Sequence, residues 1–232
     1  MRRLILCASV VAWLAAPAQA GDPCAEKGDL EYAGVVDGAI HLKWTGQIAN
    51  KMDIKLFEAF SEHQDRAREI VLDLDSCGGH SRDMEEVVKI LDLIKWTHRV
   101  NTRVGPGNTC GSACVFVFLS GKRRHGALTS SWLFHEAWSV VTGAGESIEI
   151  RSSSAWTAQA LDKYFLPAGV SKKWLARLRR RISGGSDYWQ TGRDLWESKS
   201  GIITEPIENL QRRGKERMYF MPPVVCGGFC RG

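Results

Sequence analysis

Residues 108–119 read Asn-Thr-Cys-Gly-Ser-Ala-Cys-Val-Phe-Val-Phe-Leu, a run of small residues that leads directly into an apolar stretch. The apolar part has no clear period, so its pattern alone is compatible with either a helix or a buried strand. The glycine before Ser112 favours a sharp strand-turn-helix elbow, because glycine adopts backbone angles that other residues avoid. We therefore expect Ser112 to lie at a tight turn where a helix begins.

Strand and helix patterns alternate on both sides of this run. β-Branched and leucine-rich stretches bounded by turn residues predict strands, and apolar residues at three- and four-residue spacing predict helices. The predicted strands span 31–36, 39–44, 69–74, 100–104 and 132–134, and the predicted helices span 51–64, 81–94, 153–165 and 172–182. A glycine-rich excursion is expected at 142–145. This alternation predicts an α/β fold with largely parallel strands, whose active groups gather at the carboxyl ends of the strands.

The first twenty residues have the order of a secretory signal. A charged start precedes an apolar block over 4–16 and the small-residue site Ala18-Gln19-Ala20. Cleavage before Gly21 leaves 232 − 20 = 212 residues, enough for one sizeable domain. We expect that domain over 21–210, followed by an irregular cysteine-containing tail over 211–232. The apolar block is too short for a stable membrane anchor, so we expect a periplasmic or secreted protein.

Charge and cysteine content narrow the classes of partner and ligand. The formal charge of +5 falls by two when Arg2 and Arg3 leave with the leader, so no nucleic-acid partner is indicated. An even number of remaining cysteines in an exported chain favours disulfides over metal binding, although six thiols allow 15 pairings. The six are Cys24, Cys77, Cys110, Cys114, Cys226 and Cys230. We favour a bond between Cys226 and Cys230, or from one of them to Cys24, with Cys77–Cys110 as a further possibility.

Ser112 is also a candidate for chemistry. A serine hydroxyl is a poor nucleophile until a neighbouring imidazole takes its proton, and its attack needs backbone N–H groups to receive the oxyanion. His135, at the end of the predicted strand over 132–134, can supply the imidazole. The pair Gly78-Gly79, at the end of another strand, can supply a close-approaching backbone.

From about residue 39 to 207, the chain resembles the Clp-type serine peptidases of the Clp/crotonase superfamily, particularly their exported bacterial branch. The stretches that carry the resemblance are Gly46-Gln47-Ile48, the loop over 74–79, the elbow at Ser112, Phe134-His135, Ser186-Asp187 and Gly201-Ile202-Ile203. The resemblance implies a single α/β domain, a Clp/crotonase-like spiral of β-β-α units with mostly parallel strands.

The resemblance also implies roles. Ser112 would be the nucleophile, His135 the general base and Asp187 the carboxylate that orients the imidazole. Gly78, Gly79 and Ala113 would form the oxyanion and substrate-binding backbone. The implied activity is hydrolysis of peptide bonds through an acyl-enzyme, with a peptide or protein substrate, a homo-oligomeric assembly, and neither a cofactor nor a metal.

Several departures and alternatives remain open at this stage. Cys77 stands where the family usually has a proline, which removes a rigid φ beside the oxyanion loop. His80 competes with His135 as base, and Asp194 is the fallback for Asp187. A serine-lysine pair would use Lys122, which lacks the family position. A catalytically silent module that binds a peptide or partner protein is the alternative function, whereas acyl-CoA chemistry fits poorly because that coenzyme is cytosolic.

Overall fold

The computed structural model describes residues 22–25, 27–49, 51–142 and 148–208, with the side chains of 139–152 left aside. The predicted leader, the tail over 211–232 and the pair Cys226 and Cys230 lie outside this description.

Most strands form one mixed sheet whose order is β1-β2-β3-β4-β6-β11. Only β1 and β2 pair antiparallel, and every later neighbour in this sheet is parallel. Its strands are β1 (Asp29–Val36), β2 (Ala39–Thr45), β3 (Glu69–Asp75), β4 (Arg99–Val104), β6 (Arg124–Ala127) and β11 (Glu205–Ile207). The predicted α/β fold with largely parallel strands is confirmed.

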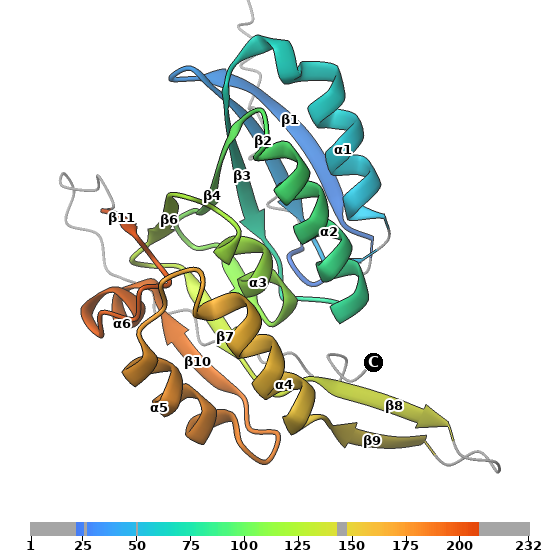
Figure 1. Ribbon diagram of the computed structural model, residues 1–232, viewed down its shortest axis with the longest axis vertical. Helices are drawn as coiled ribbons and strands as arrows, with labels where there is room; N and C mark the ends of the chain where they lie inside the picture. Colours follow the sequence, from blue (N-terminus) through green and yellow to red (C-terminus); the bar gives the residue numbers. More distant parts are fainter. Residues whose placement is uncertain (1–21, 26, 50, 143–147, 209–232) are drawn as a thin grey trace, which may run out of the picture.

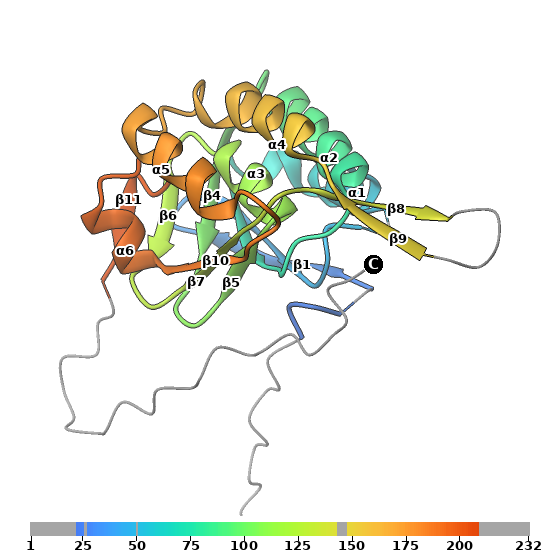
Figure 2. The ribbon, with the colours of Figure 1, turned by 90° about the horizontal axis from the view of Figure 1, so that it is seen from below.

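A smaller sheet and a hairpin complete the β structure. The smaller sheet has the order β10-β7-β5, from Tyr188–Thr191, Ser131–Phe134 and Thr109–Gly111, with β5 parallel and β10 antiparallel to β7. The hairpin joins β8 (Trp138–Thr142) to β9 (Ile148–Ser152) and extends away from the body of the domain (Figures 1 and 2). Of the glycine-rich excursion expected at 142–145, all but Thr142 lies outside the described residues. The sequence patterns did not predict the two hairpin strands.

Helices cover one side of the sheets as a layer (Figure 2). They are α1 (Met52–His63), η1 (Gln64–Arg66), α2 (Ser81–Ile94), α3 (Ala113–Leu119), α4 (Ser154–Ala160) running into η2 (Leu161–Phe165), α5 (Lys172–Ile182) and α6 (Gly192–Glu197). In β2 the side chains of Ile40, Leu42 and Trp44 are fully buried, while His41 and Lys43 between them are half-buried. This alternation places an apolar face of the main sheet against the helices.

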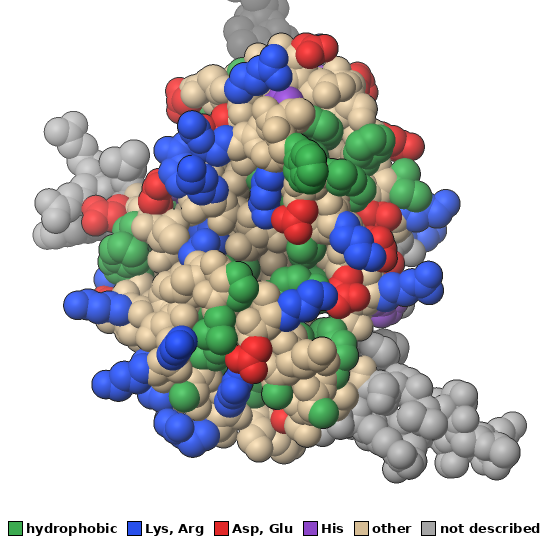
Figure 3. All heavy atoms as spheres, in the orientation of Figure 1, with side chains coloured by type: hydrophobic (Ala, Val, Ile, Leu, Met, Phe, Trp, Pro, Cys, Tyr) green, Lys and Arg blue, Asp and Glu red, His purple; other side chains and the backbone are tan. Residues whose placement is uncertain are grey.

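The basic run on α5 is the outer face of an amphipathic helix. Leu175, Leu178 and Ile182 are buried on its inner side. Lys and Arg side chains gather over this region of the surface (Figure 3), and Arg179 forms a 2.5 Å ion pair with the exposed Asp162. The charges therefore line a solvated helix face.

A buried arginine joins the last strands to the loops around them. The guanidinium of Arg124 donates to the carbonyl oxygens of Ile202 (2.7 Å), Gly121 (3.2 Å), Ala168 (2.8 Å) and Gly201 (2.8 Å). Burial lowers the pKa of Arg124. The cation thus supplies donors to four carbonyl groups. A buried carbonyl group without a donor would destabilise the fold.

Arg124→Met should therefore lower the free energy of unfolding by about 3 kcal/mol, because buried carbonyls lose their donors. Urea unfolding followed by circular dichroism measures the change. Arg123→Met is the matched control: its exposed guanidinium pairs with Glu69 and should contribute less than about 1 kcal/mol. Equal losses in the two variants would contradict the structural role given to Arg124.

Candidate active site

Ser112 forms the elbow between β5 and α3, as the sequence indicated. Its backbone angles are φ 49° and ψ −121°, a region that residues with a side chain rarely adopt. The Ser112 N–H donates to the Leu133 carbonyl oxygen at 2.8 Å, and the Gly111 N–H donates to that of Ser76 at 2.9 Å. The hydroxyl itself makes no hydrogen bond to any described residue, so it is available for another partner.

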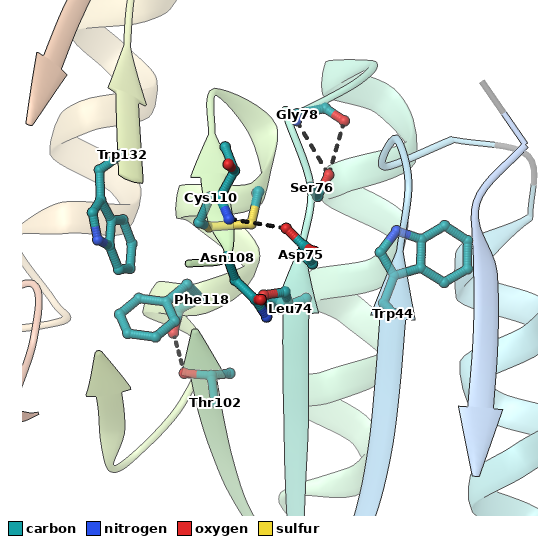
Figure 4. The surroundings of a disulfide bond; sticks show 12 residues. Trp44, Leu74, Asp75, Ser76, Gly78, Thr102, Asn108, Cys110, Phe118 and Trp132 are labelled. Carbon is teal, nitrogen blue, oxygen red and sulfur yellow. Dashed lines mark hydrogen bonds between the residues drawn. A yellow bond between two sulfur atoms is a disulfide. The ribbon is translucent and has the colours of Figure 1, made fainter. Parts of the chain in front are cut away.

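The loop after β3 lies directly against this elbow. Gly78 has φ +120°, and a Cβ on it would fall 2.6 Å from the Ser112 Cβ. The Ser76 hydroxyl accepts from the Gly78 N–H at 3.2 Å and lies 3.3 Å from the Gly78 carbonyl oxygen (Figure 4). Only glycine allows the loop this conformation and this close approach to the serine.

Two backbone N–H groups beside Ser112 are without a hydrogen-bond partner among the described residues. Ile48 bonds the Gly78 carbonyl (2.6 Å) and the His80 N–H (3.0 Å), so the intervening N–H of Gly79 is turned to the other side of the chain. Ala113 is the first residue of α3, where helical geometry leaves the N–H unpaired. The arrangement can receive negative charge next to the serine hydroxyl.

His135 leaves the smaller sheet at the same edge as Ser112. β5 and β7 are parallel and pair Gly111 with Leu133, so both strands end there. The imidazole Nδ1 lies 2.6 Å from the Glu136 carbonyl oxygen and 2.8 Å from the Trp138 Nε1. It makes no hydrogen bond with the Ser112 hydroxyl. The structure therefore brings the two residues to one edge without joining them.

Asp187 comes next to His135 in register. The ladder of β10 and β7 ends with Tyr188 opposite Phe134, and Asp187 and His135 are the residues that follow on the two chains at that end. The Asp187 side chain is exposed and bonds no described residue. The buried carboxylate of Glu136 accepts the Gly185 N–H at 3.2 Å, which holds the segment before Asp187 near the imidazole.

The competing candidates occupy other places. His80 is exposed and pairs with Asp83 at 3.1 Å. Asp194 caps α6, where its carboxylate accepts the Thr191 N–H at 2.8 Å. Lys122 follows the carboxyl end of α3, at the opposite end of the helix from Ser112. None of the three contacts Ser112 or His135.

Both disulfides among the described residues fall on the two loops of this site. Cys110–Cys114 brackets Ser112, and Cys24–Cys77 fastens the loop of Gly78 to the start of the described chain (Figure 4 shows the first). The predicted pairings of Cys24 with the C-terminal cysteines and of Cys77 with Cys110 are wrong. The Cys77 N–H donates to the Pro23 carbonyl oxygen at 2.9 Å, a tertiary contact that sequence spacing does not reveal.

The fold is shared with known peptidases. A scan against protein-family models finds no match, nor does a search of curated proteins. Among solved structures, an asparagine-to-aspartate mutant of ClpP1 from Listeria monocytogenes superposes with a TM-score of 0.51 at 16% identity, covering 75% of this chain and 92% of that one. The chain has the Clp-type peptidase fold.

Two further structures of this Clp-type fold match at a TM-score of 0.55. Both are of the 1510-N membrane-bound stomatin-specific protease. One is a serine-to-alanine mutant, at 18% identity with 73% of this chain and 77% of that one covered. The other is a lysine-to-alanine mutant in complex with a substrate peptide, at 19% identity with 73% of each chain covered. At such identities the likeness establishes the fold.

A half-buried carboxylate lies next to the strand that leads into the elbow. Asp75 ends β3, and its Oδ1 accepts the Thr109 N–H at 2.9 Å (Figure 4). Burial raises the pKa of Asp75, and the bond from Thr109 only partly opposes the effect. No cluster of three or more metal-ligating side chains occurs in the described part of the chain.

The two disulfides should differ in their contribution to stability. Cys24–Cys77 closes a loop of about 50 residues and Cys110–Cys114 one of about five. On chain entropy alone, removing the first by a double Ala substitution should cost about 4 kcal/mol and removing the second about 2 kcal/mol. Guanidinium unfolding of both variants measures the order. A larger loss for the short loop would show that local packing, rather than chain entropy, dominates.

Asp75→Asn should change the free energy of unfolding more favourably at neutral pH than in acid. When the folded-state pKa of a carboxyl group is raised, the protein loses stability as pH rises from the unfolded-state pKa through the folded-state pKa. An asparagine does not ionise, so the variant has no such loss, and its amide oxygen can still accept the Thr109 hydrogen bond. The difference in unfolding free energy between variant and wild type should therefore move in favour of the variant from pH 3 to pH 7. A constant difference would refute the assignment.

Proposed function

We propose that this chain is a serine peptidase that hydrolyses peptide bonds through an acyl-enzyme on Ser112. The observation that carries the proposal is the elbow itself. Ser112 has a strained backbone and packs against Gly78, and the N–H groups of its neighbours Gly79 and Ala113 have no hydrogen-bond partner within the described part of the chain. Strain of this kind persists only where the surrounding structure enforces it, and it clusters at functional sites.

In this mechanism the Ser112 hydroxyl oxygen attacks the peptide carbonyl carbon while its proton passes to Nε2 of His135. The oxyanion is received by the N–H groups of Gly79 and Ala113. Collapse of the intermediate breaks the C–N bond, and the imidazolium protonates the leaving amine. Water then repeats the attack on the acyl-enzyme with His135 again as base. Asp187, the residue opposite His135 in register, would orient the imidazole.

A peptide substrate and an assembly of copies are part of the proposal. One structural neighbour is held in complex with a substrate peptide. The Clp-type resemblance leads us to propose that copies of the chain assemble into a homo-oligomer.

We also propose that the protein works outside the cytoplasm, as a domain over 21–210 that follows a cleaved leader. Two disulfides are typical of an oxidising compartment. No helix in the described part of the chain is long and apolar enough to cross a membrane.

A catalytically silent module that binds a peptide or partner protein is the second candidate. The observation in its favour is that the Ser112 hydroxyl does not bond His135 and that Asp187 has no side-chain partner within the described residues. In such a module the elbow would serve only as a rigid ledge for a bound chain.

A fluorophosphonate probe separates the two functions. The oxidised mature protein should be labelled on Ser112, as mapped by mass spectrometry, and Ser112→Ala should reduce labelling at least 1000-fold, since the activated nucleophile is lost. Ser120→Ala, at the other end of α3, should leave labelling unchanged. Absence of labelling in a folded, oxidised wild type would favour the silent module.

A further inference from the structure

The Nδ1 atom of His135 lies next to one hydrogen-bond donor and one hydrogen-bond acceptor. The Trp138 Nε1–H donates to Nδ1 at 2.8 Å, and the Glu136 carbonyl oxygen lies 2.6 Å from the same Nδ1. The indole ring also meets the imidazole edge-on, with 6.0 Å between ring centroids. An indole N–H can only donate, and a carbonyl oxygen can only accept.

These two contacts correspond to two tautomers of the neutral imidazole. When Nδ1 holds a lone pair, it accepts from Trp138 and the proton is on Nε2. When Nδ1 holds the proton, it donates to the Glu136 carbonyl, and Nε2 has the lone pair. A single nitrogen cannot do both, so the indole contact and the carbonyl contact compete for the state of His135.

Only the second tautomer can act as a base toward Ser112. Nδ1 is enclosed by Glu136 and Trp138, so the proton of the hydroxyl must pass to Nε2, which needs its lone pair for the transfer. With the indole bonded to Nδ1, Nε2 is already protonated. Neither the Ser112 hydroxyl nor the Asp187 carboxylate bonds another described residue, which fits such a resting arrangement.

We propose that Trp138 is a positioning residue that holds His135 in its resting tautomer, and that a peptide substrate releases it. This inference rests on the proposed peptidase function and deepens it. Trp138 is 39% exposed at the start of β8, so a bound polypeptide can reach its indole. A peptide carbonyl is an acceptor that competes for the indole N–H. Once that bond is transferred, the proton moves to Nδ1 and Nε2 becomes the base.

Two groups can accept a hydrogen bond from the Nδ1–H of the second tautomer. The Glu136 carbonyl is within hydrogen-bond distance, and Asp187 is the next residue opposite His135 beyond the β10–β7 ladder. The base of the hairpin is anchored separately, because the Ala137 N–H donates to the Thr157 hydroxyl at 2.8 Å. Loss of the indole bond therefore changes the imidazole without unfastening the backbone around it.

The test compares Trp138→Phe with Trp189→Phe. The first keeps an aromatic ring and removes the N–H donor. The second changes a tryptophan of β10 with nearly the same exposure, 38%, which makes no hydrogen bond or ring contact with His135. Imidazole ¹⁵N chemical shifts at neutral pH report which nitrogen carries the proton. The rate at which the fluorophosphonate probe labels Ser112 reports whether Nε2 of His135 acts as a base. Thermal unfolding checks that both variants are folded.

The expected result is a proton on Nε2 of His135 in the wild type and in Trp189→Phe, and on Nδ1 in Trp138→Phe. Labelling of Ser112 without substrate should rise roughly fivefold in Trp138→Phe only, the factor expected from one hydrogen bond in a tautomer equilibrium. A proton on Nδ1 in the wild type, or an unchanged tautomer in Trp138→Phe, overturns the inference. A tautomer change with no labelling of any variant supports the role of Trp138 and refutes the peptidase.

Discussion

The backbone conformation of Ser112 is the constraint on which the site depends. A residue with a side chain at φ 49° costs of order 1–3 kcal/mol unless its surroundings leave it no alternative. Here the surroundings act from three sides. The smaller sheet holds the Ser112 N–H, the disulfide Cys110–Cys114 closes the chain on either side, and Gly78 packs against the Cβ. None of them uses the Ser112 hydroxyl.

Parallel strands explain why distant segments meet at this point. β3 ends at the loop of Gly78, β5 ends at Ser112 and β7 ends at His135. The two sheets are joined at the same edge by a parallel bridge between Ser76 and Cys110. Cys77 occupies the position at which the Clp-type resemblance leads one to expect a proline with its fixed φ. Its disulfide with Cys24 restrains the loop instead.

The imidazole is the part of the site that remains adjustable. Ser112 and the loop of Gly78 are fixed by close packing, disulfides and backbone hydrogen bonds, whereas His135 is held by contacts that favour different protonation states of one nitrogen. Control of the candidate site through the imidazole alone would leave the more costly strained elbow intact in both states.

Much of the fold and the candidate site followed from local patterns. The strand over 69–75, the helix over 172–182 and the elbow at Ser112 were predictable because burial periodicity and glycine chemistry are properties of neighbouring residues. The hairpin at Trp138 was not, since its strands pair outside the main core and bear no strong pattern.

The sequence by itself determined which residues are chemically competent: one serine at a turn, one histidine at a strand end, and glycines that can approach closely. Only the tertiary structure decided which cysteines pair, that Tyr188 lies opposite Phe134 in the β10–β7 ladder, and that Trp138 reaches the imidazole. The physical reason is that these contacts join side chains across separate elements, and their distances depend on packing rather than on spacing along the chain.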